Sequence, residues 1–387
     1  MLSFRRFAPV LAVSLAFLIP PGLATAATGP NAVVTEHYAS HPLRVRPGVS
    51  SAPTGLSPAA IKLAYGFSTG NATTDNAAGA GETIAIVDAY DDPNAEADLG
   101  VFSSKFSLPA CTAANGCFTK VNQTGGNKYP RSNSGWALEI SLDIQWAHAI
   151  APGAKILLVE ASSNSFTNLM AAEDYATKIN AQTTKSNAQY VSNSWGGSEF
   201  SGESTYDSHF VQSGVSFFVS SGDSGLPASY PSASPNVISV GGTTLNFDST
   251  QAFSSETGWS GSGGGCSAYE NAAGAQLGFT EYVNVSCAGK RATPDVSLDA
   301  DPASGVSVYD SVKYMGQSGW WTVGGTSASS PMWAARSAVA GTVVNASYVY
   351  GDSITYRDIT SGGNNGASYF TGLDLVTGRG SWLVVTP

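Results

Sequence analysis

The sequence predicts an α/β fold in which a mostly parallel central sheet carries helices on both faces. Five short apolar runs rich in β-branched residues have the composition of buried parallel strands. They are Thr83–Ala89, Ala154–Ala161, Tyr190–Trp195, Val215–Ser221 and Asn236–Gly242. Stretches that fit helices, such as Ser165–Ile179, separate several of these runs. Alternation of strands and helices is typical of a parallel sheet covered on both sides.

The composition indicates a globular chain. Of its 387 residues, 42% are hydrophobic and 12% charged, so the chain can bury a full core. The net charge of −10 and the 18 Lys and Arg residues argue against a nucleic-acid partner. The region from Thr243 to Gly325 is rich in Gly and Ser and predicts loops and short strands. No boundary between two domains is visible in the sequence, so we expect a single domain. We also expect a monomer.

The N-terminus has the features of an export signal. Arg5 and Arg6 precede the apolar run Phe7–Pro20, and Ala24-Thr25-Ala26 forms a small-residue cleavage site. This predicts a signal peptide over residues 1–26 and a secreted, extracellular protein without a membrane partner once processed. The alternative is an uncleaved N-terminal anchor, although the run is short for a membrane span. Residues 27–55 predict a short extended lead-in to a domain covering 56–387.

The four cysteines predict two disulfides, because the chain is expected to be exported. Three pairings are possible. We favour the two local ones, Cys111–Cys117 and Cys266–Cys287. A metal site at these cysteines is disfavoured, since no His or further Cys lies nearby at ligand spacing in the sequence.

Ser327 is a candidate nucleophile. It follows Gly-Gly-Thr in "GGTSASSPMWAA" (Gly324–Ala335), at the start of a stretch that fits a helix. Free amides at a helix start can stabilise an oxyanion. A serine that only caps the helix is the alternative. Such a nucleophile usually needs a histidine base, yet none of the four histidines lies in an obvious base motif.

Glu139 and Asp143 are candidate acid–base groups within Gly135–Ile156. The apolar residues there alternate, which taken literally predicts a strand, but a helix is also possible. In a helix the two acids lie about 5–6 Å apart at Cβ, whereas a strand separates them by about 13 Å. Only the helix makes a carboxylate pair, and that pair would share a proton. Two solvated acids on an exposed face are the alternative.

Asp223 and a C-terminal loop complete the candidate sites. Asp223 follows an apolar strand in a Gly-flanked turn, and parallel sheets carry their sites at the carboxyl ends of strands. Asp358 and Asp374 flank a Gly- and Asn-rich loop within Tyr356–Trp382. Two carboxylates with loop carbonyls suit Ca²⁺. Ordinary turn aspartates are the alternative at all three positions.

These motifs, in this order, resemble the sedolisin or serine-carboxyl peptidase family, whose members are secreted endopeptidases on a subtilisin-like fold. The similar segments are "GGTSASSP", "ALEISLDIQWAHAIAPGAKI", "SSGDSG", and "RDIT" followed by "GLDLVTGRG". The resemblance spans residues 56–387. The resemblance implies polypeptide substrates. It also implies that Gly135–Ile150 is mostly helix.

The resemblance also implies roles for four residues. Ser327 would be the nucleophile and Glu139 the general base and then acid. Asp143 would orient Glu139 and share its proton, and Asp223 would donate to the oxyanion beside the Ser327 amide. A carboxylate base works best in acid, and an aspartate can donate a hydrogen bond only while protonated. We therefore expect an acidic optimum.

One structural calcium ion follows from the same resemblance. Asp358 and Asp374 would supply carboxylate oxygens, and Ile359, Phe370 and Gly372 would supply carbonyls. Phe370 stands where the family usually has Gly. The family also usually carries a long folded propeptide, whereas the predicted lead-in here is short, so it is a possible minimal pro-segment.

Two other functions fit parts of the sequence. A subtilisin-type triad would use Asp88, His148 and Ser327, but "AHAIAP" lacks the His-Gly-Thr setting of that family. On a helix His148 also lies about 140° from Asp143. The second alternative is a catalytically degenerate secreted binding protein on a peptidase fold. Digestion of casein by the wild type but not by Ser327→Ala would exclude it.

Overall fold

A computed structural model describes residues 36–179, 186–250, 252–351, 353–363 and 366–384. The predicted signal peptide, residues 1–26, and the first part of the predicted lead-in lie outside these residues. Among the helices of the described ranges, none is long and apolar enough to cross a membrane.

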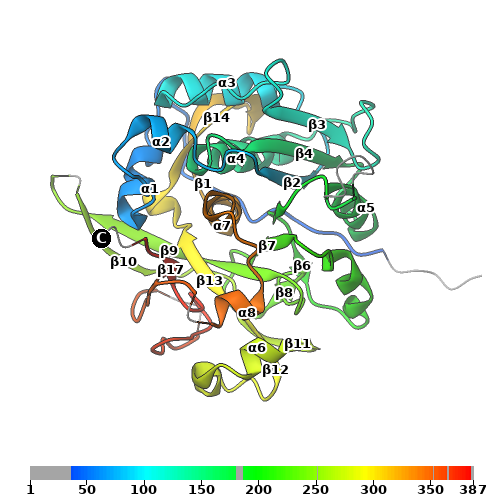
Figure 1. Cartoon of the computed structure of the whole chain (residues 1–387), viewed down its shortest axis with the longest axis vertical. Coiled ribbons are helices and arrows are strands. Elements are labelled where there is room, and N and C mark those ends of the chain that lie inside the picture. Colours follow the sequence, from blue (N-terminus) through cyan, green and yellow to red (C-terminus); the bar gives the residue numbers. More distant parts are fainter. Residues whose placement is uncertain (1–35, 180–185, 251, 352, 364–365, 385–387) are drawn as a thin grey trace, which may run out of the picture. The chain divides into compact units, whose positions relative to one another are not determined.

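The central sheet is mostly parallel, as predicted (Figure 1). Within the described residues it has ten strands in the order β16-β17-β13-β9-β7-β5-β2-β4-β3, with β10 paired to β9. The pairs from β17 through β3 are all parallel, whereas β16 and β10 pair antiparallel with their neighbours. The strands are β2 (Thr83–Ala89), β3 (Phe118–Asn122), β4 (Lys155–Ala161), β5 (Tyr190–Asn193), β7 (Ser216–Ser220), β9 (Ile238–Phe247), β10 (Phe253–Gly258), β13 (Val296–Asp299), β16 (Tyr356–Arg357) and β17 (Ser381–Trp382).

Helices pack on both faces of this sheet, because its strands are apolar on both faces. Along β2, Ile84 and Ile86 belong to one core cluster, and Ala85 and Val87 belong to a second. Helices α4 and α7 contribute to the first cluster and α5 to the second (Figure 1). The helices are α1 (Pro58–Tyr65), α2 (Ala72–Asn76), α3 (Ala95–Phe106), α4 (Ser134–Ile150), α5 (Phe166–Ala176), α6 (Gly274–Leu277), α7 (Thr326–Ala340) and α8 (Ala346–Val349), with 3₁₀ turns at Glu203–Phe210, Thr280–Val285 and Pro302–Ser304.

The segment that contains Glu139 could be a strand or a helix from its sequence, and in the structure it is helix α4. The Asn133 side chain caps it by accepting hydrogen bonds from the amides of Gly135 and Trp136. Every residue from Trp136 to Ile150 is buried. Because all sides of the helix are covered, apolar residues occupy every face, and their apparent alternation carries no information about a strand.

The Gly- and Ser-rich region before Ser327 is more regular than predicted. Strands β14 (Val306–Tyr314) and β15 (Gln317–Gly324) form a long antiparallel hairpin, and β1 (Arg44–Val45) pairs with β15. Cross-strand ring contacts stabilise it, with Tyr309 at 5.3 Å from Trp320 and Tyr314 at 5.8 Å from Trp321. The expectation of only loops and short strands was therefore wrong here. Smaller antiparallel pairs are β6 (Gly197–Ser198) with β8 (Ser229–Tyr230) and β11 (Gly265–Asn271) with β12 (Lys290–Thr293).

Both favoured disulfides are present. Cys111 pairs with Cys117, and Cys266 pairs with Cys287. Each closes a short stretch of chain, in agreement with the local pairing preferred from the sequence.

Candidate active site

Ser327 lies at the buried start of α7. Gly325 caps the helix at φ 105°, a conformation that disfavours other residues, and its amide donates to the carbonyl of Ala300 at 2.6 Å. The Ser327 side chain is fully buried, and its hydroxyl makes no hydrogen bond within the described part of the chain. A buried hydroxyl without a partner is uncommon. The Ser327 hydroxyl is therefore free to interact with a reacting group.

Glu139 and Asp143 lie one turn apart on α4, which packs against α7. Both carboxyl groups are fully buried, and neither forms a hydrogen bond to the described residues. Burial raises the pKa of Glu139 well above its usual value, and the charge of Asp143 raises it further. The nearby Ser327 hydroxyl favours the charged form and so lowers this pKa. Asp143 also has a raised pKa because of burial, opposed by the nearby Ser194 hydroxyl. The structure thus brings Ser327 and this carboxylate pair together.

Asp88, at the end of β2, adds a third carboxyl group to this site. It is fully buried, and among the described residues neither of its oxygens has a hydrogen-bond partner. Burial raises its pKa, and the charges of Asp143, Glu139 and Glu160 raise it further. Neighbouring buried carboxylates cannot all be ionised, so the group retains protons well above the usual carboxyl range.

Asp223 lies after strand β7 and contacts the start of α7. Its Oδ1 atom accepts hydrogen bonds from the Thr326 amide at 2.8 Å and the Thr326 hydroxyl at 3.1 Å. Its Oδ2 atom is buried and accepts no hydrogen bond within the described ranges. Burial raises the pKa of Asp223 to about 7, although the Thr326 amide and the charge of Arg44 oppose the shift. Below that pH Oδ2 can carry a proton and donate it towards a bound oxygen.

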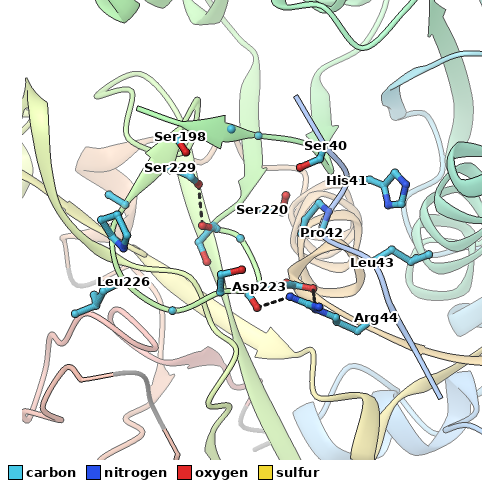
Figure 2. A pocket seen from close by; sticks show the side chains of 18 residues that line it. Ser40, His41, Pro42, Leu43, Arg44, Ser198, Ser220, Asp223, Leu226 and Ser229 are labelled. Atoms are coloured by element: carbon cyan, nitrogen blue, oxygen red, sulfur yellow. Dashed lines mark hydrogen bonds and ion pairs between the residues drawn. The ribbon is translucent and has the colours of Figure 1, made fainter. Parts of the chain in front are cut away.

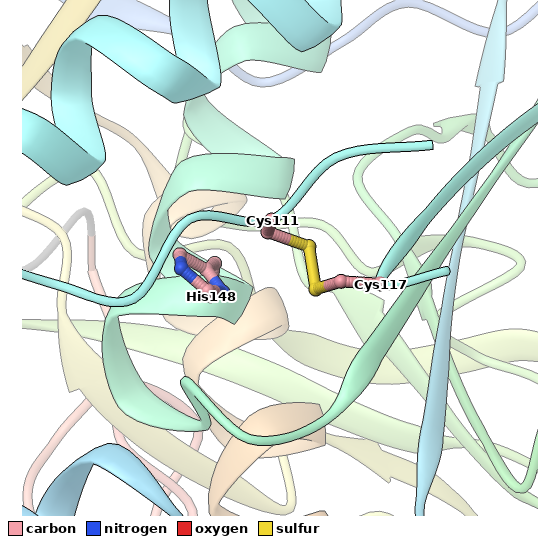
Figure 3. A group of neighbouring side chains, drawn as sticks. All are labelled: Cys111, Cys117 and His148. Carbon is pink, nitrogen blue, oxygen red and sulfur yellow. A yellow bond between two sulfur atoms is a disulfide. The ribbon is translucent and has the colours of Figure 1, made fainter. Parts of the chain in front are cut away.

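His148 does not reach this site. Its Nε2 atom lies 2.9 Å from the carbonyl oxygen of Pro109, beside the Cys111–Cys117 disulfide (Figure 3). It is nine residues beyond Glu139 on the same helix, about 13 Å along the axis. The triad Asp88–His148–Ser327 is therefore not assembled.

The grouping of His148 with Cys111 and Cys117 differs from the sequence reasoning, which placed no histidine near these cysteines. The ligand atoms of the three residues lie within 4.8 Å of one another. However, both sulfur atoms are in a disulfide and offer no thiolate for a metal. The spacing argument against a metal site at these cysteines therefore does not hold. The disulfide is a separate argument against such a site.

The lead-in contributes residues that the sequence reasoning missed. His41 Nδ1 lies 3.4 Å from Glu139 Oε2, and Arg44 donates to the backbone carbonyl of Asp223 at 2.9 Å. Residues 40–44 line a cavity of about 370 Å³ together with residues 196–198 and 220–229 (Figure 2). No local sequence signal marks His41 or Arg44, because their partners are distant in the chain.

The predicted calcium loop brings its two aspartates close together. Asp374 is fully buried, and burial raises its pKa to about 7, with the charge of Asp358 raising it as well. Asp358 Oδ2 accepts from the Gly372 amide at 3.1 Å, while the buried Oδ1 has no partner in the described structure. Two adjacent carboxyls with an unpartnered buried oxygen fit a hard cation. The Ile359 side chain is buried, whereas Phe370 is 38% exposed.

Comparison with known proteins confirms the resemblance to sedolisins. Sedolisin of Pseudomonas sp. (strain 101) is 30% identical over 335 residues, covering 73% of this chain and 54% of that protein. Kumamolisin of Bacillus sp. (strain MN-32) is 30% identical over 375 residues, covering 86% and 63%. Xanthomonalisin of Xanthomonas sp. (strain T-22) is 28% identical over 358 residues, covering 74% and 41%. The chain thus spans less than two thirds of the length of these relatives.

Solved structures confirm the subtilisin-like α/β fold. The Pseudomonas sedolisin, described as a serine-carboxyl proteinase in complex with two molecules of pseudo-iodotyrostatin, superimposes with a TM-score of 0.68 at 28% identity. The match covers 86% of this chain and 96% of that structure. An S41 psychrophilic protease shares the fold at 18% identity, with a TM-score of 0.56. The family model described as "Subtilase family" matches residues 124–348, more than half of the chain, so the protein belongs to the subtilase family.

Proposed function

We propose that this protein is a serine-type endopeptidase that hydrolyses polypeptides with Ser327 as nucleophile and Glu139 as base. The observation that carries the proposal is the meeting of Ser327 with the buried Glu139–Asp143 pair, from helices far apart in the sequence. Asp223, beside the start of α7, supplies a polar group where an oxyanion would form. The family membership and the sedolisin relatives support the same reaction.

The residues divide the reaction between them. Glu139 takes the proton of the Ser327 hydroxyl as that oxygen attacks the substrate carbonyl, and then gives it to the leaving amine. Asp143 holds Glu139 in place and shares the proton of the pair. Protonated Asp223 donates from Oδ2 to the oxygen that gains negative charge. Water then hydrolyses the Ser327 ester, with Glu139 again accepting a proton.

We propose an acidic working range for this chemistry. Asp223 has a pKa of about 7 and can donate only below it. The Glu139–Asp143 pair must have lost at least one proton to provide a base. Activity is therefore expected in the pH range above the first ionisation of the Glu139–Asp143 pair and below the ionisation of Asp223.

We also propose that the protein is secreted as a monomer, with residues 1–26 as signal peptide, 27–55 as lead-in and 56–387 as peptidase domain. Asp358, Ile359, Phe370, Gly372 and Asp374 would hold one structural calcium ion. When bound, that ion neutralises the two adjacent carboxylates and ties the loop between them to the domain.

Casein digestion measured from about pH 3 to about pH 7 tests the proposal. Ser327→Ala and Glu139→Gln should each lower kcat at least about a thousandfold, since each removes a group that acts in the transition state. Ser337→Ala is the matched control, because Ser337 lies on the same helix and is equally buried, and its hydroxyl donates to the Trp333 carbonyl at 2.9 Å. It should keep near-wild-type kcat. Equal digestion by wild type and Ser327→Ala would overturn the proposal and favour the degenerate binding protein.

A further inference from the structure

A second cavity, of about 670 Å³, lies at the opposite end of helix α7 from Ser327. Its walls come from α2 and the loops on either side of it, from the last turns of α7, and from Val384. Arg336, which lines the cavity, follows Ser327 by nine residues on α7, about 13 Å along the helix axis. The cavity is therefore separate from the candidate active site.

Two aromatic rings hold the guanidinium of Arg336 in place. Its central carbon lies 4.8 Å from the ring centroid of Trp382 and 5.3 Å from that of Phe67. A guanidinium that rests on the faces of aromatic rings is stabilised by cation–π attraction without using its N–H groups. The ring contacts therefore fix the position of Arg336 and leave its hydrogen-bond donors unused.

Arg336 has no acceptor in the part of the chain that the structure describes. Its guanidinium forms no hydrogen bond or ion pair there, and its Nε atom is buried. Burial lowers the pKa of Arg336, as expected for a cation that has lost water without gaining an anion. In contrast, Arg357 pairs with Glu256 at 2.7 Å, and Arg379 donates to two backbone carbonyls at 2.6 Å and 2.9 Å. Arg336 therefore has donors available for a ligand.

The other residues of the cavity restrict the kind of anion that fits. Asp75 and Glu82 also line it, so an anion with several charges, such as a phosphate dianion, is repelled. The Asp75 carboxylate is held in its own loop, where it accepts from the Thr69 amide at 2.8 Å and the Ser68 hydroxyl at 2.5 Å. Much of the remaining wall is apolar and includes Phe67, Ala77, Ala78, Ala80, Val339 and Val384. This combination fits a single negative charge on an apolar body.

We propose that this cavity binds the C-terminal carboxylate of a peptide, with the N–H groups of Arg336 as its donors and the apolar wall as the site of the last side chain. An arginine fork matches the two oxygens of a carboxylate. The volume of the cavity is within the usual range of small-molecule sites. Each cut by a peptidase produces a new C-terminal carboxylate. That the ligand is a cleavage product rests on the proposed function, whereas the binding itself does not.

Isothermal titration calorimetry of the full chain carrying Ser327→Ala tests the site without hydrolysis of the ligand. The probe is acetyl-Ala-Leu at about pH 5, where its carboxyl group is ionised. We expect binding with a Kd of about 1 mM or lower. The C-terminal amide of the same peptide has the same shape but no charge, and it should bind at least about tenfold more weakly. Equal Kd values for the acid and the amide would overturn the proposal.

Variants of Arg336 in the same background test its role. Arg336→Met keeps an apolar stem but removes the donors, so the Kd for the acid should rise at least about tenfold. Arg336→Lys keeps the charge but loses the planar fork, and its Kd should lie between those of the parent and Arg336→Met. Arg131→Met is the matched control, since Arg131 also lies over an aromatic ring, that of Tyr90, but does not line the cavity. Unchanged binding by a folded Arg336→Met variant would overturn the proposal.

The pH dependence of binding gives a second readout. From about pH 5 to about pH 3 the peptide carboxyl group gains a proton, so the preference for the acid over the amide should disappear. Asp75 and Glu82 also gain protons in this range, and the amide reports their effect because it carries no charge. A preference for the acid that persists at pH 3 would contradict a charge-dependent contact with Arg336. Casein digestion by the wild type tests the proposed function separately, because peptide binding is measured without Ser327.

Discussion

The two carboxyl oxygens of Asp223 lie in different environments because Thr326 bonds to one of them. Both Thr326 donors bond to Oδ1, while Oδ2 has no hydrogen-bond partner in the described structure. The Thr326 amide belongs to the start of the helix that carries Ser327, so the carboxyl group is oriented by the same turn that places the nucleophile. A proton on Asp223 is therefore directed to Oδ2.

This orientation predicts different outcomes for two substitutions of Asp223. Asp223→Asn can keep its oxygen towards Thr326 and present an amide hydrogen where Oδ2 lies, at every pH. Its kcat should exceed that of Asp223→Ala, which should lose about 10²–10³ through loss of the oxyanion donor. The pH–rate profile of the wild type should fall as the pH rises through about 7, where Asp223 ionises, and Asp223→Asn should lack that fall. A wild-type profile that peaks above pH 7 would contradict the role of Asp223.

Thr326→Val should lower kcat at least about fivefold, since it removes a hydrogen bond of about 1 kcal/mol that orients Asp223, together with the contacts of the same hydroxyl to the Gly222 backbone. The Thr326 hydroxyl favours the charged form of Asp223, so its loss should also raise the pKa of Asp223 and move the alkaline limb upward. Thr326→Ser retains the hydroxyl and serves as control. Measuring kcat against pH for both variants distinguishes this role from simple packing, which would lower kcat without moving the limb.

The free energy of unfolding should decrease as pH rises from about 4 to about 8. Burial raises the pKa of Glu160, Glu173 and Asp310 to about 8 each, whereas in the unfolded chain they titrate near 4. The folded state therefore binds more protons in this range, and stability present at low pH is lost as pH rises through the folded values. His41 and His148, with pKa lowered by burial to about 4, act in the opposite direction below pH 6.5.

Thermal midpoints at pH 4, 6 and 8 measure this slope, using Ser327→Ala to avoid self-digestion. Glu173→Gln should reduce the slope because one buried proton acceptor is gone. Glu96→Gln, an exposed contact that keeps an oxygen to accept the Ala113 amide, is the control and should leave the slope unchanged. A midpoint that rises from pH 4 to 8 would contradict the assignment of raised carboxyl pKa values.

Calcium should stabilise the fold through the Asp358–Asp374 loop. At a calcium concentration one hundred times Kd the gain is about 2.7 kcal/mol, which raises the thermal midpoint of a domain of this size by about 4 °C. A chelator should reverse the shift, and Asp358→Ala should abolish it. Asp248→Asn, an exposed turn residue, should respond to calcium like the wild type. An Asp358→Ala variant that keeps the full shift would exclude this loop as the site.

Much of the fold was predictable because its signals are local. The run Thr83–Ala89 is strand β2 with the same bounds, since a short apolar run with β-branched residues has few alternatives to a buried strand. The two disulfides were predictable because each joins cysteines that are close in the sequence. The helix around Glu139 was not predictable from periodicity, because its burial on all sides removes the amphipathic pattern on which such reasoning depends. The long β14–β15 hairpin was missed because Gly and Ser are abundant around its aromatic pairs.

The sequence by itself determined the alternation of strands and helices, the cysteine pairs, and which acids and which serine were worth considering. Only the tertiary structure decided that Glu139 meets Ser327, that His148 lies beside a disulfide, and that His41 and Arg44 contact the candidate catalytic acids. Local patterns report the conformation and burial of nearby residues. Contacts between distant segments depend on how α4, α7 and residues 38–45 pack around the sheet, and no short stretch of sequence encodes that packing.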